Sequence, residues 1–417
     1  MTSKVAEHLV NSSVQSCLDC ESRSALHEAA AAGHLEVVKL LIDNNTEIDA
    51  TDQSGNTPLH YAVWFRSELV AELLLQQGAD INAQNNTLWT PLHFACYQGN
   101  SVMTQLLLRP EFRAKVDLPG PILITALMWA ADNGDETILG FLLQTGAQLN
   151  IPDRDGQTAL HHAAARGYIT TLKILLEAGA DIEHQSRMGA RPIHIATQYG
   201  HAEAVRVLLE FGSDPNAEIN GGWNPLHSAA SRGHVTVMET LLERRWRADI
   251  ELRGAYNKTA LIWAAEIGQN GSVRMLLSRN ANVNARDAFQ ESSLHYAAAN
   301  GYLDVVMELV ENGADVLARN GRHHQPLHSA TINHGSLYPI VKYLMEKGAD
   351  VNSRDGWGVS ALHNAAKFGN KRQVRFLLES GADPRLENNE GESAIDIAKA
   401  KGHGDMIEML ENYVPQQ

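Results

Sequence analysis

Histidine is the residue whose spacing in this sequence most strongly suggests a chemical role. At nine places a histidine directly follows a leucine or isoleucine, at intervals near 33 residues or twice that: His27, His60, His93, His161, His194, His227, His295, His328 and His363. A metal ion would need several of these rings within about 2 Å of itself. Side chains one packed element apart lie about 10 Å from each other. We therefore interpret these histidines as buried structural donors and expect no metal and no cofactor.

The other residues that could do chemistry form no recognisable site. Cys17 and Cys20 are a lone Cys-x-x-Cys pair, with no second pair for a zinc site and no βαβ pattern for a redox site, and Cys96 stands alone. The sequence has no glycine-rich phosphate loop, no G-x-S-x-G elbow and no H-E-x-x-H helix. We assign no catalytic residue, and the sequence favours a protein that is not an enzyme.

The elements that would position these residues repeat along the chain. Twelve short phrases begin 33 or 35 residues apart, at Leu26, Leu59, Leu92, Leu127, Leu160, Ile193, Leu226, Leu261, Leu294, Leu327, Leu362 and Ile395. In the second unit Asp52 and Gly55 predict a turn, and Thr57 and Pro58 predict the start of a short helix. A second amphipathic helix follows and stops at Gly78. Neither helix could bury its apolar face alone, so stability must come from stacking of the units.

These phrases resemble ankyrin repeats. The resemblance is carried by TPLHYA (57–62), TPLHFA (90–95), TALHHA (158–163), NPLHSA (224–229) and SALHNA (360–365). The first, third and fifth of these lie about twenty residues ahead of a Gly-Ala phrase. It implies an all-α repeat solenoid of stacked helix-turn-helix ankyrin repeats with short β-hairpin fingers and a concave groove that binds partners. We expect an N-terminal cap at 1–18, a single solenoid of about twelve repeats at 19–413 and a tail at 414–417.

The same resemblance implies which side chains face the groove. They are the residue after the motif histidine, the pair three and four residues further on, and the hairpin residue before the Thr position. Our candidate partner-binding residues are Tyr61, Trp64, Phe65, Trp89, Phe94, Tyr97, Trp129, Asp132, His162, Arg166, Tyr199, Trp223, Trp263, Glu266, Tyr296 and Trp357, the last of which lies two residues before the hairpin position on its own finger. Exposed aromatic patches usually mark binding sites. The alternative is that these rings pack against neighbouring fingers and thicken the core.

Two clusters emerge, one in repeats two to five and one in repeats seven to nine. In each, a carboxylate lies near a tryptophan on one helix face: Asp132 beside Trp129, and Glu266 beside Trp263. An aromatic wall with an acidic group suits a cation. We therefore expect a protein or peptide partner that offers basic or cationic side chains.

Three functions are compatible with these patterns. The leading hypothesis is a non-catalytic interaction scaffold or adaptor that binds a protein or peptide in its aromatic and acidic groove. The alternative is a small-molecule-binding or catalytic site in repeats two to five, with Asp132 and His162 as an acid–base pair. A third possibility is assembly through Trp246, which lies among arginines in an insertion.

Charge and hydropathy limit which classes of partner the chain could bind and which cellular compartment it could occupy. The formal net charge of −15 and the absence of a Lys/Arg-rich run argue against nucleic-acid binding. No stretch approaches eighteen continuous apolar residues, so we expect no membrane insertion. The first ten residues lack the apolar core of a secretory signal, and the few cysteines are best explained as reduced thiols. We therefore expect an intracellular protein, cytoplasmic or nuclear or both.

Overall fold

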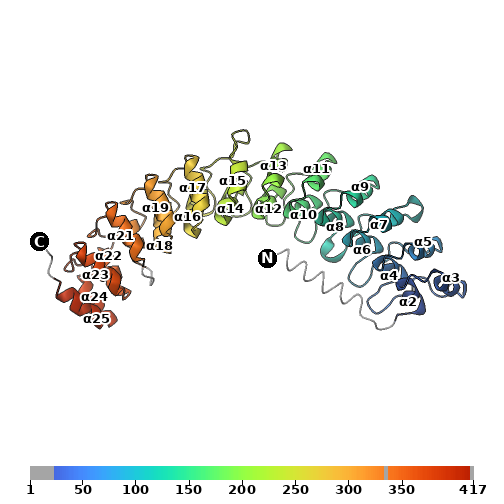
Figure 1. Ribbon diagram of the computed structural model, residues 1–417, viewed down its shortest axis with the longest axis horizontal. Helices are drawn as coiled ribbons and strands as arrows, with labels where there is room; N and C mark the ends of the chain where they lie inside the picture. The colour runs from blue at the N-terminus through green and yellow to red at the C-terminus, as the bar shows by residue number, and fades with distance from the viewer. Residues whose placement is uncertain (1–22, 333–336, 414–417) are drawn as a thin grey trace. The chain divides into compact units, whose positions relative to one another are not determined.

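The computed structural model describes residues 23–332 and 337–413, which form pairs of short antiparallel helices joined by extended fingers (Figure 1). The contacts divide the chain into two compact units, one ending at Asp214 and the other beginning at Pro215. The first helices of the repeats form one row within each unit, and the second helices form another (Figure 1). The predicted cap at 1–18 and tail at 414–417 lie outside the described residues and stay predictions.

The first helix of each repeat is short and alanine-rich. In the first unit these helices are α2 (Ala25–Ala31), α4 (Pro58–Trp64), α6 (Pro91–Tyr97), α8 (Ala126–Asn133), α10 (Ala159–Arg166) and α12 (Pro192–Gln198). In the second unit they are α14 (Pro225–Arg232), α16 (Ala260–Ile267), α18 (Ser293–Asn300), α20 (Pro326–Ser329), α22 (Ala361–Lys367) and α24 (Ala394–Lys401). Small alanine side chains let consecutive first helices approach closely, so the groups at their surface lie side by side.

The second helix of each repeat is amphipathic and has seven to nine residues. In the first unit these helices are α3 (Leu35–Asp43), α5 (Glu68–Gln76), α7 (Ser101–Leu107), α9 (Glu136–Gln144), α11 (Ile169–Glu177) and α13 (Ala202–Glu210). In the second unit they are α15 (Val235–Leu241), α17 (Asn270–Ser278), α19 (Leu303–Glu311), α21 (Tyr338–Glu346), α23 (Lys371–Glu379) and α25 (Gly404–Glu411). In the described ranges no helix is long and apolar enough to cross a membrane.

The fingers are hydrogen-bonded turns rather than two-stranded ladders. In the second repeat the backbone N–H of Asp52 donates a hydrogen bond to the carbonyl oxygen of Asn56. The Asp52 carboxylate in turn accepts a hydrogen bond from the backbone N–H of Asn56 at 2.7 Å. The side chain thereby replaces the second backbone bond that a β ladder would make. Among the described residues β pairing is limited to isolated bridges, Arg286 with Ser292 and Glu387 with Ser393. The β-hairpin part of the prediction is corrected accordingly, whereas the helical repeat solenoid is confirmed.

Three 3₁₀ turns interrupt this pattern: η1 (Pro110–Phe112), η2 (Pro121–Leu123) and η3 (Ala255–Asn257). Turns η2 and η3 form the fingertips of repeats four and eight, the interior repeats in which methionine or isoleucine replaces the motif histidine. The core lies between the two rows of helices, where the motif residues Leu26, Leu160 and Leu294 are fully buried. The core therefore holds each finger against the helices of its own unit.

Candidate functional site

The motif histidines are structural groups, as predicted. The ring Nδ1 of His60 accepts a hydrogen bond from the backbone N–H of Thr57 at 3.1 Å. The Nε2 of the same ring lies 3.0 Å from the carbonyl oxygen of Trp89 in the next finger. The same Nε2 bridge to the following finger recurs in His27, His161, His227, His295, His328 and His363. Burial lowers the pKa of His60 to about 4, so the ring is neutral. Within residues 23–332 and 337–413 no group of three His, Cys, Asp or Glu side chains is placed to hold a metal.

The tryptophan of the third finger lies in the core and not on the groove surface. Trp89 is fully buried, with its ring 4.8 Å from Phe94 and 5.4 Å from Trp129, both by centroid distance and both stacked. Phe94 is 2% exposed and Trp129 is 6% exposed. The finger folds back over α6 and α8, so its indole fills the space between them. These three rings therefore pack against neighbouring fingers and helices as part of the core, which is the alternative to a groove-side position.

An accessible part of this stack remains at its edge. Trp64 stacks on Tyr97 with ring centroids 6.4 Å apart, and both are half-buried. Phe65, at the end of α4, is 48% exposed and stacks on the buried ring of Tyr61. We call Trp64, Phe65 and Tyr97 the aromatic edge. Their rings rest on the buried rings beneath, which restricts their motion.

His162 lies between two carboxylates. Its Nδ1 is 3.6 Å from an oxygen of Asp132, and its Nε2 is 3.1 Å from an oxygen of Asp153. Arg166 donates to both oxygens of Asp132, at 3.0 and 2.9 Å. Burial would lower the pKa of His162, but the hydrogen bonds to the two carboxylates raise it to about 9. The result is an alternating chain of charges, Asp153, His162, Asp132 and Arg166.

These contacts also hold Asp132 in its charged form. Burial would raise its pKa, yet the hydrogen bonds from His162 and Arg166 lower it to about 2. Sequence reasoning brought Asp132, His162 and Arg166 together but missed Asp153. The sequence did indicate Asp153, because an aspartate of the finger precedes the residue after the motif histidine by a fixed number of positions. The same nine-residue offset pairs Asp52 with Tyr61 and Asp287 with Tyr296.

The second cluster contains its own cation. Lys258 is buried, and its Nζ lies 2.6 Å from Glu266, 4.5 Å from the Trp263 ring centroid and 4.1 Å from that of Tyr296. Trp223 packs on Trp263 with ring centroids 4.5 Å apart. From the sequence we expected a partner to supply this cation, and Lys258 was not identified. The signal was present, because Lys258 directly precedes Thr259, in the same hairpin row as Trp89 and Trp223.

The two clusters are versions of one site. An offset of 134 residues relates Trp89 to Trp223, Trp129 to Trp263, Asp132 to Glu266, Asp153 to Asp287 and His162 to Tyr296. Each unit thus contains a tryptophan pair, a carboxylate on the first helix and an aspartate in the next finger. The cation that neutralises the helix carboxylate differs, since the first unit uses His162 with Arg166 and the second uses Lys258.

Models of known families match nearly all of the chain. A model of ankyrin repeats in three copies matches residues 2–85, 92–186, 127–219, 183–254, 247–320 and 327–415, and a model of ankyrin repeats in many copies matches 66–108. The chain belongs to the ankyrin repeat family. Ankyrin repeats generally serve as protein–protein interaction modules.

Two curated proteins match short segments of this ankyrin repeat chain. One is Serine/threonine-protein kinase 12 of Arabidopsis thaliana, 41% identical over 49 residues, which are 12% of this chain and 11% of that protein. The other is Putative ankyrin repeat protein FPV223 of Fowlpox virus (strain NVSL), 47% identical over 38 residues, which are 9% of this chain and 27% of that protein. The chain therefore spans only a tenth to a quarter of the relatives it matches.

Three of the aromatic residues in this ankyrin repeat chain lie apart from the two clusters. Tyr199 is 40% exposed and stacks on His201, and Trp357 is 55% exposed on a fingertip beside His324. Trp246, in the insertion after α15, is half-buried under the guanidinium of Arg245, which lies 4.0 Å from the ring centroid. The assembly role suggested for Trp246 stays a prediction.

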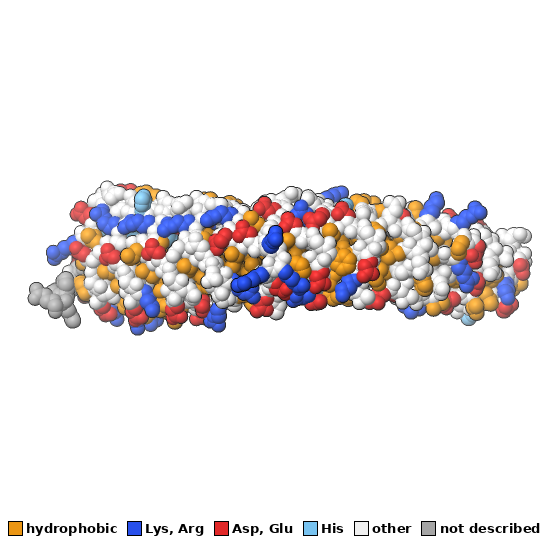
Figure 2. All heavy atoms as spheres, turned by 90° about the horizontal axis from the view of Figure 1, so that it is seen from above, with side chains coloured by type: hydrophobic (Ala, Val, Ile, Leu, Met, Phe, Trp, Pro, Cys, Tyr) orange, Lys and Arg blue, Asp and Glu red, His pale blue; other side chains and the backbone are white. Residues whose placement is uncertain are grey.

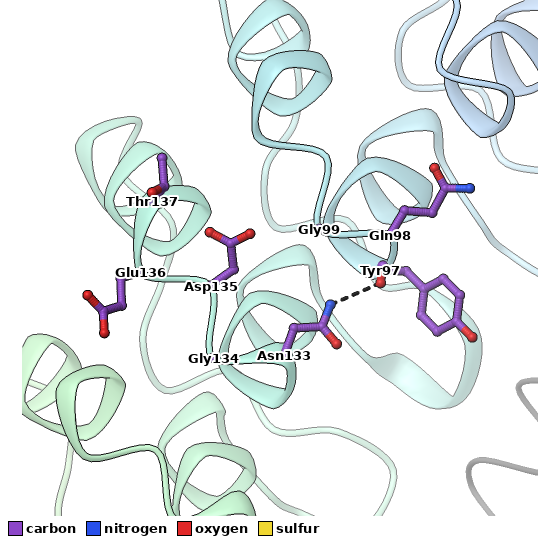
Figure 3. Close-up of a pocket in the computed structure, with 8 residues that line it drawn as sticks. All are labelled: Tyr97, Gln98, Gly99, Asn133, Gly134, Asp135, Glu136 and Thr137. Carbon is purple, nitrogen blue, oxygen red and sulfur yellow. Dashed lines mark hydrogen bonds between the residues drawn. The ribbon is translucent and has the colours of Figure 1, made fainter.

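A hollow beside the aromatic edge is open and polar. It is lined by Tyr97, Gln98, Gly99, Asn133, Gly134, Asp135, Glu136 and Thr137. Asn133 donates to the carbonyl of Tyr97 at 2.9 Å, and the Tyr97 ring points away from Asp135 and Glu136 (Figure 3). Asp132 and His162 do not line it. Small-molecule sites are usually concave and mostly apolar, so this hollow does not favour the small-molecule alternative.

Proposed function

We propose that this chain is a non-catalytic interaction module that holds an apolar segment of a protein partner against the aromatic edge of its first unit. The observation that carries the proposal is Phe65, a residue that is 48% exposed although its ring stacks on a buried tyrosine. Trp64, which directly follows Val63 on α4 and precedes Phe65, stacks on Tyr97 with ring centroids 6.4 Å apart. Aromatic rings with this combination of support and exposure dominate binding energies at protein interfaces.

The support beneath the edge lowers the cost of binding. Tyr97 lies 5.4 Å from the ring centroid of Trp89 and 5.1 Å from that of Trp129, and both indoles are buried. A ring that is already held loses little rotamer freedom when a partner covers it, and each side chain immobilised on binding otherwise costs about 0.5–1.5 kcal/mol. The edge is therefore pre-organised for contact with another apolar surface.

The charges near the edge support an apolar partner more than a cationic one. Asp132 is already neutralised by His162 and Arg166, and Glu266 of the second unit is neutralised by Lys258. A partner's lysine or arginine would have to displace one of these internal cations. Leucine, methionine or aromatic side chains can cover the edge without breaking an ion pair.

The same internal pairing argues for a role without catalysis. A general base must be unprotonated and able to reach a substrate. His162 has a pKa of about 9, and both of its ring nitrogens face carboxylates. Asp132 has a pKa of about 2 and is covered by Arg166. These groups stabilise the packing of α8 against α10.

The proposal can be tested with an exposed residue of the edge and a matched control. Phe65→Ala should reduce recovery of the bound partner by at least tenfold in an affinity purification from source cells, because a central aromatic anchor contributes about 2 kcal/mol or more. Leu69→Ala is the control, since Leu69 is 68% exposed on α5 and does not belong to the edge.

The readout is quantitative mass spectrometry, followed by direct binding of the purified partner to both variants. Equal recovery with wild type and Phe65→Ala would remove the aromatic edge as the binding surface. A Trp64→Ala variant that keeps the wild-type circular dichroism spectrum but loses the same partner would extend the assignment to the half-buried ring.

A further inference from the structure

Four arginines form a ladder along the fingers of the second unit. Arg253 donates through Nη1 to the carbonyl of Asn257 in its own finger and to that of Arg286 in the next, at 3.1 and 2.6 Å. Arg286 bridges in the same way to Gln290 and Arg319, and Arg319 bridges to His323 and Arg354. Arg354 ends the ladder with bonds to Gly358 and Glu387. Basic side chains form a row over the C-terminal part of the chain (Figure 2).

Within the described ranges the guanidinium groups of this ladder form no ion pair. Among the described residues no carboxylate oxygen lies within 4.0 Å of these four guanidinium groups, and their bonding partners are backbone carbonyls. Arg253, Arg319 and Arg354 are exposed and Arg286 is half-buried. The bonds of the first three run through Nη1, which leaves Nε and Nη2 for another acceptor. In a chain of net charge −15 this row is an exception.

The first unit supplies evidence that the backbone bridge does not require a positive charge. The same position there holds Thr51, Gln84, Pro119, Pro152 and Gln185. Gln84 makes the bridge with its amide, donating to the carbonyls of Leu88 and Pro119 at 3.5 and 2.8 Å. Since glutamine suffices to join two fingers, the four charges of the second unit are free for a different role.

A row of exposed rings runs beside the arginine ladder. Tyr256 is 63% exposed, Phe289 is 57% exposed and Trp357 is 55% exposed, and Arg322 occupies the same register between the last two. The rings of Tyr256 and Phe289 are 6.1 Å apart by centroid. Each ladder arginine bonds the carbonyl of the residue that directly follows one of these tip residues. Each of the four consecutive fingers therefore has a ladder arginine, and three of the four also have an exposed ring at the tip.

We propose that this surface binds an extended acidic polypeptide segment with Asp or Glu at every third position. Neighbouring repeats pack at about 10 Å. A polyproline II segment rises about 3.1 Å per residue with three residues per turn, so every third side chain points the same way about 9.3 Å further on. Its carboxylates would match successive guanidinium groups, and its intervening apolar residues would contact the exposed rings. Guanidinium groups favour carboxylates through charge-assisted hydrogen bonds.

A polypeptide fits this surface better than a nucleic acid does. The row holds four charges in a molecule that is strongly negative overall, and a continuous phosphate backbone would experience the repulsion of the whole chain. A short acidic segment carries few charges and also offers apolar side chains for the rings. The site lies in the second unit, so it is independent of the aromatic edge proposed above, and either can fail without the other.

The experiment uses the full chain and a fluorescein-labelled probe, (Glu-Pro-Leu)5, with fluorescence anisotropy as the readout. We expect Arg286→Gln/Arg319→Gln to weaken binding at least tenfold, because glutamine keeps the backbone bridge and removes two charges. The control is Arg274→Gln/Arg375→Gln, which removes two exposed charges from α17 and α23 of the same unit and should change affinity less than twofold. Binding should also weaken with added salt.

Two further measurements separate the register from general electrostatics. A peptide of the same composition with its glutamates contiguous should bind at least fivefold more weakly than (Glu-Pro-Leu)5. Phe289→Ser, which leaves the arginine ladder intact, should weaken binding while keeping its salt dependence. Equal losses in the two arginine pairs, equal affinity for the two peptides, or tighter binding of a single-stranded oligonucleotide than of the probe would each overturn the proposal.

Discussion

At the scale of single residues, two adjacent histidines of α10 differ in charge. His161 is buried and neutral, and His162, which directly follows it, is held as a cation. The difference arises from what each ring faces. His161 faces the carbonyl of Ala190, whereas His162 faces Asp132 and Asp153. Two adjacent imidazoles on one helix therefore have pKa values of about 4 and about 9.

This contrast predicts an unusual titration. The folded pKa of His162 lies above the 6.5 of a free ring, so its stabilising contribution is fully present below pH 6.5 and is lost as the pH rises through about 9. The contribution is on the order of 3 kcal/mol. Selective labelling of histidine should show one ring still protonated at pH 8 by NMR, and that signal should disappear in His162→Gln. A midpoint at or below pH 7 would contradict the geometry.

At the scale of elements, the fingertips of repeats four and eight adopt a left-handed backbone. Ile122 and Leu123 have φ of 49° and 65°, and Tyr256 and Asn257 have φ of 57° and 61°. Left-handed backbone costs a non-glycine residue roughly 1–2 kcal/mol, and asparagine tolerates it best. Repeat eight therefore has a residue suited to its turn at the second position, whereas repeat four keeps a leucine there.

Copying the residue of repeat eight into repeat four should stabilise the protein. Leu123 is 44% exposed, so Leu123→Asn loses little packing and relieves strain. We expect the free energy of unfolding in urea to rise by about 0.5–1 kcal/mol. Leu317→Asn is the control, because Leu317 is 46% exposed in another finger and does not have a positive φ. No gain from Leu123→Asn relative to this control would show that the turn is not strained.

At the scale of the whole molecule, the buried histidines together make the stability of the fold depend on pH. Six of them have a pKa lowered by burial to about 4: His60, His93, His161, His227, His295 and His328. Both units contain three of these rings. Unfolding exposes the rings and allows them to take up protons, so mild acid favours the unfolded chain.

The sign of this effect sets the pH window. A folded pKa below 6.5 means that the stabilising contribution is present above pH 6.5 and declines as the pH falls toward about 4. We expect the helical circular dichroism signal to be lost between pH 6 and 4, with a urea midpoint that already falls at pH 6. An unchanged urea midpoint at pH 5 would mean that the histidines are not buried as neutral rings.

The repeat period alone determined the fold of this protein. Twelve phrases in register fix the helix pairs, because each helix is too short to be stable alone and must stack on its neighbours. The role of the motif histidines followed from the same period, since a spacing of one repeat keeps their rings too far apart for a shared ligand. The row of finger side chains that includes Trp89 and Trp223 was also predicted, but Lys258 in the same row was missed.

Only the tertiary structure decided which of those side chains reach solvent. Trp89 and Phe65 both belong to groove-side rows, yet one is fully buried and the other is 48% exposed. Periodicity gives the direction of a side chain from its own helix or finger but not what the next finger places over it. The carboxylates illustrate the same limit. The repeat register places His162 and Arg166 near Asp132, but only the structure shows that they neutralise it and that Lys258 neutralises Glu266.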